Sequence, residues 1–238
     1  GAFAAGVALE PVPVREASSL AVVVGASVAL AVSIVRRKAG VAGERERLAR
    51  RSERVSAMTG IDRRPDGPDP DVPEFPPALD LIAPIVAVPG LVAAGIDAGD
   101  PAVLSVLRVL VGAAFLGAIS DGMLLGHWYL VQPGLARRPL LEMVRWTGLI
   151  WPFEVLLLLW PTGMGSVLSG TIDDGYNGML GWFWVACAVT TIGLVVVTRA
   201  ALRERYYSAV MAATGLLYLA ILTAFGTDLV ARALLASS

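Results

Sequence analysis

The sequence predicts an all-α, polytopic integral membrane protein, a helical bundle with about six transmembrane helices, and three observations support this. Apolar residues make up 56% of the chain and charged residues 16%, against roughly 45–50% and 25% in soluble domains. The apolar residues are gathered in long blocks separated by short polar segments, as in membrane proteins. The sequence also lacks the stretches of alternating polarity, about ten residues long, that mark outer-membrane barrels.

Six blocks approach or exceed the ~20 residues that span ~30 Å of hydrocarbon. The chain therefore divides into a non-cytoplasmic N-terminal segment (1–17), a first transmembrane helix (18–35), a cytoplasmic charged arm (36–78) and a five-helix transmembrane bundle (79–238). The apolar residues 1–9 are too few to span, so we expect the remainder of a processed signal or of an earlier helix. The predicted spans are 18–35, 79–98, 102–131, 140–160, 179–198 and 208–227.

The distribution of basic residues predicts how the helices are oriented. The loops after the first, third and fifth predicted spans hold most of the arginines, whereas acidic residues dominate the opposite side. The positive-inside rule therefore places these three loops in the cytoplasm and both termini on the non-cytoplasmic side. Arginine supplies 18 of the 19 basic side chains. With abundant alanine and valine, this usage suggests a GC-rich bacterial genome and hence the bacterial plasma membrane.

Charge, cysteine content and motifs argue against several classes of function. The net charge of −1 disfavours nucleic acid as a partner, because binding it requires a clustered basic face. Cys187 is the single cysteine, so intrachain disulfides and CxxC metal motifs are excluded. The sequence also lacks a phosphate-binding loop, a nucleophile elbow, an HExxH motif and a dinucleotide fingerprint. We therefore expect a protein that is not an enzyme on its own.

The arm 36–78 has two parts. The first contains GERERLARRSERVSAM and predicts a helical extension of the first span. Val41, Leu48 and Val55 recur every seven residues along it and form a narrow seam. The second contains six prolines, and their spacing favours an extended, polyproline-like chain. The arm is either a solvated tether or, in the sharper interpretation, a cytoplasmic docking segment for other subunits of a membrane complex.

Five of the ionisable side chains inside the third and fourth predicted spans are candidate site residues. A charged group near the bilayer centre costs at least ~2.5–3.5 kcal/mol, so it is paired or functional. At about 1.5 Å per residue, Arg108 and Glu154 share a depth near the outer leaflet. Arg145 lies near the level of His127, and Asp121 is closest to the midplane. These residues are either interhelical pairs that fix the packing or the lining of a site for protons, an ion or another ligand. The pairs we expect are Arg108 with Glu154, and Arg145 with Asp121 or His127.

His127 is the only histidine and has three interpretations. In the first, His127 has a structural role near the cytoplasmic interface, where Trp128 and Tyr129 form part of an expected aromatic belt. The same three side chains are candidates for contact with a quinone headgroup or for a proton site. His127 is also the only candidate metal ligand, and it binds haem only if a second ligand comes from elsewhere. Nearby, Gly122 and Gly126 form a GxxxG step that predicts close packing of another helix.

Two functions from different classes fit these features. The first is a non-catalytic membrane subunit of a larger bacterial complex, preferably a respiratory or other electron-transfer complex. It would anchor partner subunits and contribute to a quinone or proton site. The alternative is a small proton- or ion-coupled transporter that uses Asp121, Arg108 and Glu154. A membrane enzyme with haem or metal at His127 comes third. A quinone or lipid is the expected small-molecule partner, since no motif implies another cofactor.

Overall fold

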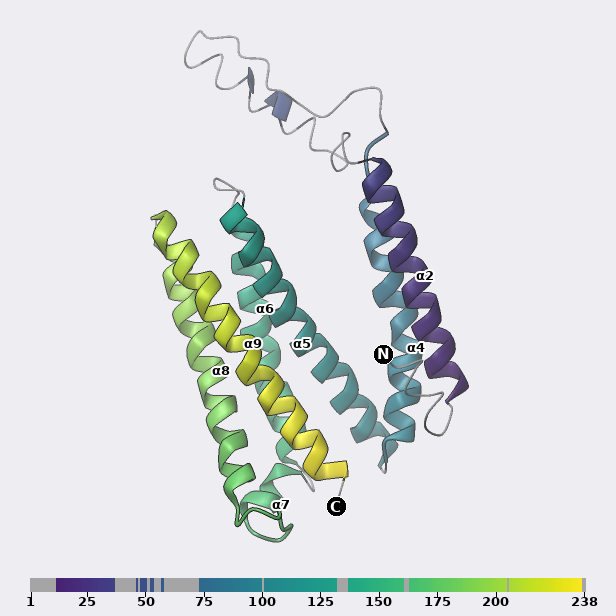
Figure 1. Ribbon diagram of the computed structural model, residues 1–238, viewed down its shortest axis with the longest axis vertical. Helices are drawn as coiled ribbons and strands as arrows, with labels where there is room; N and C mark the ends of the chain where they lie inside the picture. Colours follow the sequence, from purple (N-terminus) through teal and green to yellow (C-terminus); the bar gives the residue numbers. More distant parts are fainter. Residues whose placement is uncertain are drawn as a thin grey trace. The chain divides into compact units, whose positions relative to one another are not determined.

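The fold is all helical, as the sequence predicts. The computed structural model describes residues 12–36, 46, 48–50, 52–53, 57, 73–99, 101–131, 137–160, 163–204 and 206–236. All of the elements in these ranges are helices (Figure 1). The predictions for the opening residues 1–9 and for the seam and most of the proline-rich part of the arm fall outside the described residues. The elements are α2 (Pro13–Val35), η1 (Pro77–Leu81), α4 (Ile82–Asp97), α5 (Ala102–Val131), α6 (Arg138–Leu159), α7 (Met164–Leu168), α8 (Met179–Arg203) and α9 (Tyr207–Ala236).

Five helical stretches are long and apolar enough to cross a membrane, which makes this a multi-pass membrane protein. They are α2, η1 together with α4, α5, α8 and the Ser208–Leu235 part of α9. The remaining predicted span, 140–160, corresponds to α6, which has 22 residues but carries four charged side chains. Helix α6 is long enough to cross a membrane, but its composition is less apolar than that of the five stretches above. A sixth span and the sidedness of the termini therefore stay predictions.

The last helix is longer than the sequence pattern suggested. The predicted span ends at Thr227, but α9 continues to Ala236. Asp228 and Arg232, which the sequence pattern assigned to the outer loop, thus lie within the helix. The charges do not end the helix because Arg232 and Asp228 are four residues apart and pair with each other on one face.

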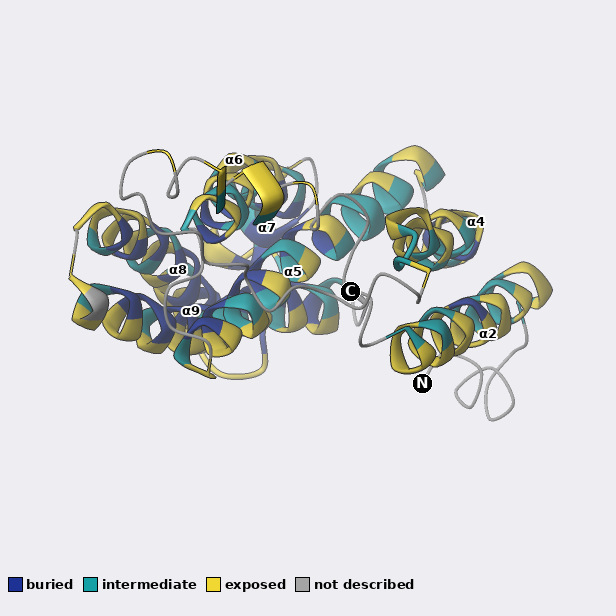
Figure 2. Cartoon of the chain, turned by 90° about the horizontal axis from the view of Figure 1, so that it is seen from above, coloured by how far each residue is buried: buried dark blue, intermediate teal, exposed yellow. Residues whose placement is uncertain are grey.

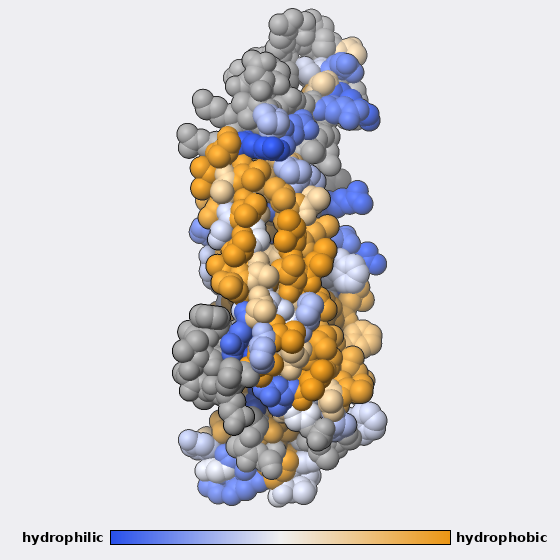
Figure 3. Space-filling view, turned by 90° about the vertical axis from the view of Figure 1, so that its right-hand side faces the viewer, coloured by the Kyte–Doolittle hydropathy of each residue, from blue (hydrophilic) through white to orange (hydrophobic). Residues whose placement is uncertain are grey.

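The chain forms two compact units, and the first reaches from Gly1 to Ala94. Within it, α2 runs antiparallel to η1 and α4: Gly90 lies against Ser18, and Gly25 against Ile82. Large apolar side chains of both helices are exposed. Figure 3 shows such side chains covering much of the face it presents. A surface of this kind suits lipid. Because this unit groups most of α4 with α2, the five-helix bundle 79–238 stays a prediction.

The second unit, from Gly95 to Ser238, is built on four long helices. Contacts join α5 to α6, α6 to α8, α8 to α9 and α9 to α5, so these four helices form a closed bundle. Figure 2 shows their buried residues facing one another. On α5 the buried positions recur every three or four residues, which is the spacing of one helix face. They are Gly112, Phe115, Ile119, Gly122, Gly126 and Tyr129.

The predicted close packing at the GxxxG step is confirmed. The Oγ1–H group of Thr214 on α9 is shared between the carbonyl of Gly126, at 3.1 Å, and that of Val210 on its own helix, at 2.9 Å. A Cβ added at Gly126 would lie 3.1 Å from the same Oγ1 atom, so a larger residue would crowd Thr214. Glycine at this position therefore lets α5 and α9 approach closely.

The loop before α8 is held by one carboxylate. Asp174 is buried, and its side chain accepts hydrogen bonds from the backbone N–H groups of Tyr176, Gly178, Leu180 and Gly181 over 2.8–3.4 Å. Burial acts to raise the pKa of Asp174, but the four hydrogen bonds outweigh it and lower the pKa below its ordinary value. Asp174 thus satisfies N–H groups that open α8.

We expect Asp174→Asn to lower the melting temperature at neutral pH, because one charged acceptor is lost. Because the pKa of Asp174 is lower in the folded state than the unfolded-state value of about 3.9, its ionised form stabilises the fold at pH values above that value. This stabilisation is lost as the pH falls through the folded-state pKa. The gap between wild type and variant should therefore close below about pH 4. Asp173→Asn is the control, since Asp173 is exposed and accepts one bond, from Gly175. Equal losses in both variants would contradict the assignment.

Candidate functional site

Charged side chains from three helices meet at one end of the four-helix bundle. Helix α5 begins at this end, whereas α6 and α9 finish there. At about 1.5 Å per residue, Arg108 lies ~9 Å from the start of α5, Glu154 ~8 Å from the end of α6, and Arg232 ~6 Å from the end of α9. Asp228 lies one turn before Arg232. We call Arg108, Glu154, Asp228 and Arg232 the charged cluster.

An ion pair on α9 forms one side of the charged cluster. The Arg232 Nε atom donates to Asp228 Oδ1 over 2.7 Å, and the two side chains are 35% and 11% exposed. Arg232 Nη2 also donates to the backbone carbonyl of Arg108 over 2.9 Å. Arg232 therefore links α9 to the first turns of α5.

Glycine at position 112 makes room for the charged cluster. A Cβ there would lie 2.3 Å from Arg232 Nη2, 2.9 Å from Asp228 Oδ1 and 3.4 Å from Glu154 Oε1. The three functional groups thus approach the same point on the backbone of α5. Any side chain at Gly112 would occupy the space that they share.

Glu154 is the most unusual member of the charged cluster. Its side chain is fully buried, with 0% exposure. Among the residues that the structure describes, no N–H or O–H group donates to either carboxyl oxygen, and the Asp228 carboxylate lies within reach of a hydrogen bond from the protonated form. The negative charge of Asp228 and the positive charge of Arg232 both act on it. A buried carboxylate without donors is costly, by several kcal/mol, so the geometry favours a group that holds a proton.

Arg108 does not complete a pair with Glu154, although both lie at the end of the bundle where their depths predicted them. Arg108 Nε donates to the carbonyl of Leu157 over 2.8 Å, and Nη2 donates to that of Trp160 over 3.4 Å. The last carbonyls of a helix have no partner within the helix and attract basic side chains. Arg108 therefore caps α6, and the predicted Arg108–Glu154 pair is replaced by this cap.

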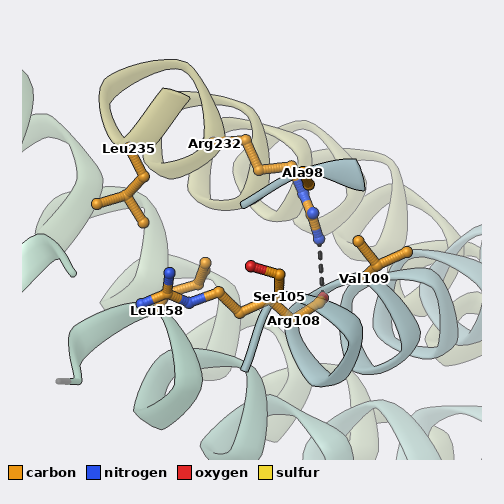
Figure 4. A pocket seen from close by; sticks show the side chains of 7 residues that line it. All are labelled: Ala98, Ser105, Arg108, Val109, Leu158, Arg232 and Leu235. Atoms are coloured by element: carbon orange, nitrogen blue, oxygen red, sulfur yellow. Dashed lines mark hydrogen bonds between the residues drawn. The ribbon is translucent and has the colours of Figure 1, made fainter. Parts of the chain in front are cut away.

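A pocket of about 210 Å³ adjoins the charged cluster (Figure 4). Arg108 reaches it from α5, and Arg232 reaches it from α9. Ser105, one turn before Arg108, directs its hydroxyl toward the same space. The other walls are apolar. The lining residues are Ala98, Ser105, Arg108, Val109, Leu158, Arg232 and Leu235.

The remaining predicted site residues lie elsewhere on the second unit. Asp121, His127 and Arg145 are exposed. His127 Nδ1 lies 3.2 Å from the hydroxyl of Tyr218 on α9, and the two rings meet edge to face. No hydrogen bond or ion pair joins Arg145 to Asp121 or His127 within the described part of the chain. Arg145 therefore forms neither of its two predicted pairs.

The predicted aromatic corner for a quinone is divided between two environments. Trp128 is 52% exposed beside His127, whereas Tyr129 is 4% exposed and packs in the core with Leu140 and Val144. The three side chains of the proposed headgroup contact thus do not share one surface. Over the described residues, no three His, Cys, Asp or Glu side chains are grouped so that they could hold a metal ion.

Asp228 and Arg232 are the site residues that the sequence pattern did not identify. The signal was present: an acid and a base four residues apart pair on one helix face. The predicted span ends at Thr227, which leaves both charges outside it.

No protein-family model, curated protein or solved structure matches the chain. The function is therefore inferred from the geometry of the charged cluster and the pocket.

Proposed function

We propose that this protein is a small proton-coupled transporter of the bacterial plasma membrane. The observation that carries the proposal is Glu154, a fully buried carboxyl group that receives no hydrogen bond from the described residues and lies beside the Asp228–Arg232 pair. Ionisable groups inside membrane helices form proton relays in many pumps and transporters. In this proposal Glu154 gains and loses the coupled proton.

The position of Glu154 gives a physical reason for coupling. In the protonated form it fits its buried site without an unpaired charge. In the ionised form it would compete with Asp228 for Arg232, and the pair that ties α9 to α5 would weaken. Proton loss would thus loosen an interhelical contact, which is the kind of change that a transport cycle requires.

The arrangement of the core supports a transporter closed on one side. The pocket lies at one end of the bundle, near Arg108 and Arg232. Farther along α5, Phe115 and Ile119 are fully buried against Ala220 and Ala224 of α9. This apolar layer separates the pocket from the opposite end of the bundle. Transport requires the layer to open in a second conformation.

Proteoliposomes test this function directly. The purified protein is reconstituted, a pH gradient is imposed, and uptake is followed for a radiolabelled panel of small carboxylates, amino acids and amines. We expect gradient-driven uptake of at least one solute, reduced at least ten-fold in Glu154→Gln. Glu142→Gln, on the same helix but outside the charged cluster, should retain uptake. Absence of gradient-driven uptake for the whole panel, or unchanged uptake in Glu154→Gln, would overturn the proposal.

One observation favours a second function, that of a non-catalytic subunit in a larger membrane complex. Asp121 is exposed on α5, and it lies ~15 Å from the end of that helix at about 1.5 Å per residue. At this depth an ionised carboxylate is unstable against lipid. A neighbouring polypeptide with a basic or hydrogen-bonding residue in its own membrane helix would cover it. A respiratory or other electron-transfer complex would supply such a neighbour.

Crosslinking in native membranes tests this second function. A photo-reactive amino acid at position 124, one turn from Asp121, is exposed like Leu124, the residue it replaces. We expect one defined adduct with another membrane polypeptide, weakened when Asp121→Leu is added. Crosslinks only to lipid or within the chain would overturn the subunit function.

A further inference from the structure

We propose that the pocket beside the charged cluster binds a small organic anion with one carboxylate and a short apolar body. This inference rests on the proposed function in one respect, the protonated state of Glu154. It adds the chemical class of the substrate, which follows from the donors, charge, size and walls of the pocket.

The donors come from two arginines on different helices. A guanidinium group carries five N–H donors. Arg108 donates two N–H groups, to the carbonyls of Leu157 and Trp160. Arg232 also donates two, to the Asp228 carboxylate and to the carbonyl of Arg108. In the described structure the remaining N–H groups of both side chains are uncommitted. Figure 4 shows the two guanidinium groups and the Ser105 hydroxyl around one space.

The charge balance of the charged cluster calls for one anion. Arg108 and Arg232 contribute two positive charges, and Asp228 contributes one negative charge. With Glu154 protonated, one positive charge is uncompensated where side chains of three helices line the pocket. A single carboxylate restores neutrality, and an arginine fork matches its two oxygens.

The size and walls of the pocket select among anions. Its volume of about 210 Å³ corresponds to roughly seven liquid-water volumes of ~30 Å³. It is smaller than the ~300–1,000 Å³ of pockets for drug-sized ligands. Ala98, Val109, Leu158 and Leu235 form the rest of the lining. They offer apolar contact to a short carbon chain and no hydrogen bonds to a fully hydrated polyanion, so a monocarboxylate fits better than phosphate.

Calorimetric titration of the purified full chain tests the inference, with butyrate as the probe. Butyramide has the same shape without the charge. Inorganic phosphate and glycerol phosphate represent a free phosphate and a phospholipid headgroup. We expect butyrate to bind at least ten-fold more tightly than each of the other three. Tighter binding of either phosphate, or equal binding of butyramide, would overturn the assignment.

Two variants locate the site. Arg108→Gln removes a guanidinium, and Val109→Phe fills the pocket while leaving both arginines in place. Each should weaken butyrate binding at least ten-fold, whereas Arg138→Gln, at the far end of α6, should bind like wild type. If Arg108→Gln fails to fold, Val109→Phe alone decides. Unchanged binding in Val109→Phe would place the anion elsewhere and overturn the inference.

The two proposals fail separately. Butyrate binding without gradient-driven uptake would keep the carboxylate site and overturn the transporter. Gradient-driven uptake of another solute without butyrate binding would keep the transporter and overturn the carboxylate site.

Discussion

Gly112→Val is expected to destabilise the second unit by about 2–4 kcal/mol and to abolish butyrate binding. The first added carbon alone would lie 2.3 Å from Arg232 Nη2 and 2.9 Å from Asp228 Oδ1. Arg232 must therefore leave its place, which separates it from Asp228 and from the carbonyl of Arg108. The loss appears as a lower melting temperature in detergent and a flat titration curve.

Gly117→Val is the matched control for this prediction. It introduces the same side chain on the same helix, but a Cβ at Gly117 meets no atom within 4 Å. Valine also has a better helix propensity than glycine, by a few tenths of a kcal/mol. We expect Gly117→Val to be neutral or slightly stabilising and to bind butyrate. Similar behaviour of the two variants would show that Gly112 does not adjoin the charged cluster.

Phe115→Ala should destabilise the protein by about 3–5 kcal/mol, the usual cost of truncating a fully buried phenylalanine. Phe115 is 0% exposed and packs with Ile119 of α5 and with Ala220 and Ala224 of α9. Alanines cannot move to fill the space, so a cavity remains in the apolar layer. The free energy of unfolding in mixed detergent measures the loss.

The control is Phe153→Ala on α6, because Phe153 is 62% exposed. Its truncation removes contact with detergent or lipid and leaves no internal cavity. We expect a change below about 1 kcal/mol. A loss as large as that of Phe115→Ala would contradict the arrangement of α5 and α6.

Much of the fold could be predicted because the membrane imposes it. A long apolar stretch must form a helix in lipid, where every backbone group needs a partner, so the long helices follow from length and composition. The end of α9 does not follow from length and composition. Asp228 and Arg232 interrupt the apolar run, and only their mutual pairing keeps them inside the helix.

The candidate site was predicted in part, for reasons that individual residues make clear. The depths of Arg108 and Glu154 followed from the helix rise, and both lie at the same end of the bundle. The partner of Arg108 could not be predicted, because Arg108 binds backbone carbonyls at the end of α6 and the sequence does not mark these by any side chain. The face of Asp121 could have been inferred. It is nine residues after Gly112, about 180° around the helix, and Gly112 faces the core.

We expect Glu154 to carry a proton inside the charged cluster, and difference infrared spectroscopy of the purified protein measures this protonation. A protonated carboxyl group has a C=O stretching band that an ionised carboxylate lacks. Such a band should be present at neutral pH, disappear in Glu154→Gln and persist in Glu142→Gln. Coincident spectra of wild type and Glu154→Gln in the carboxyl region would contradict it.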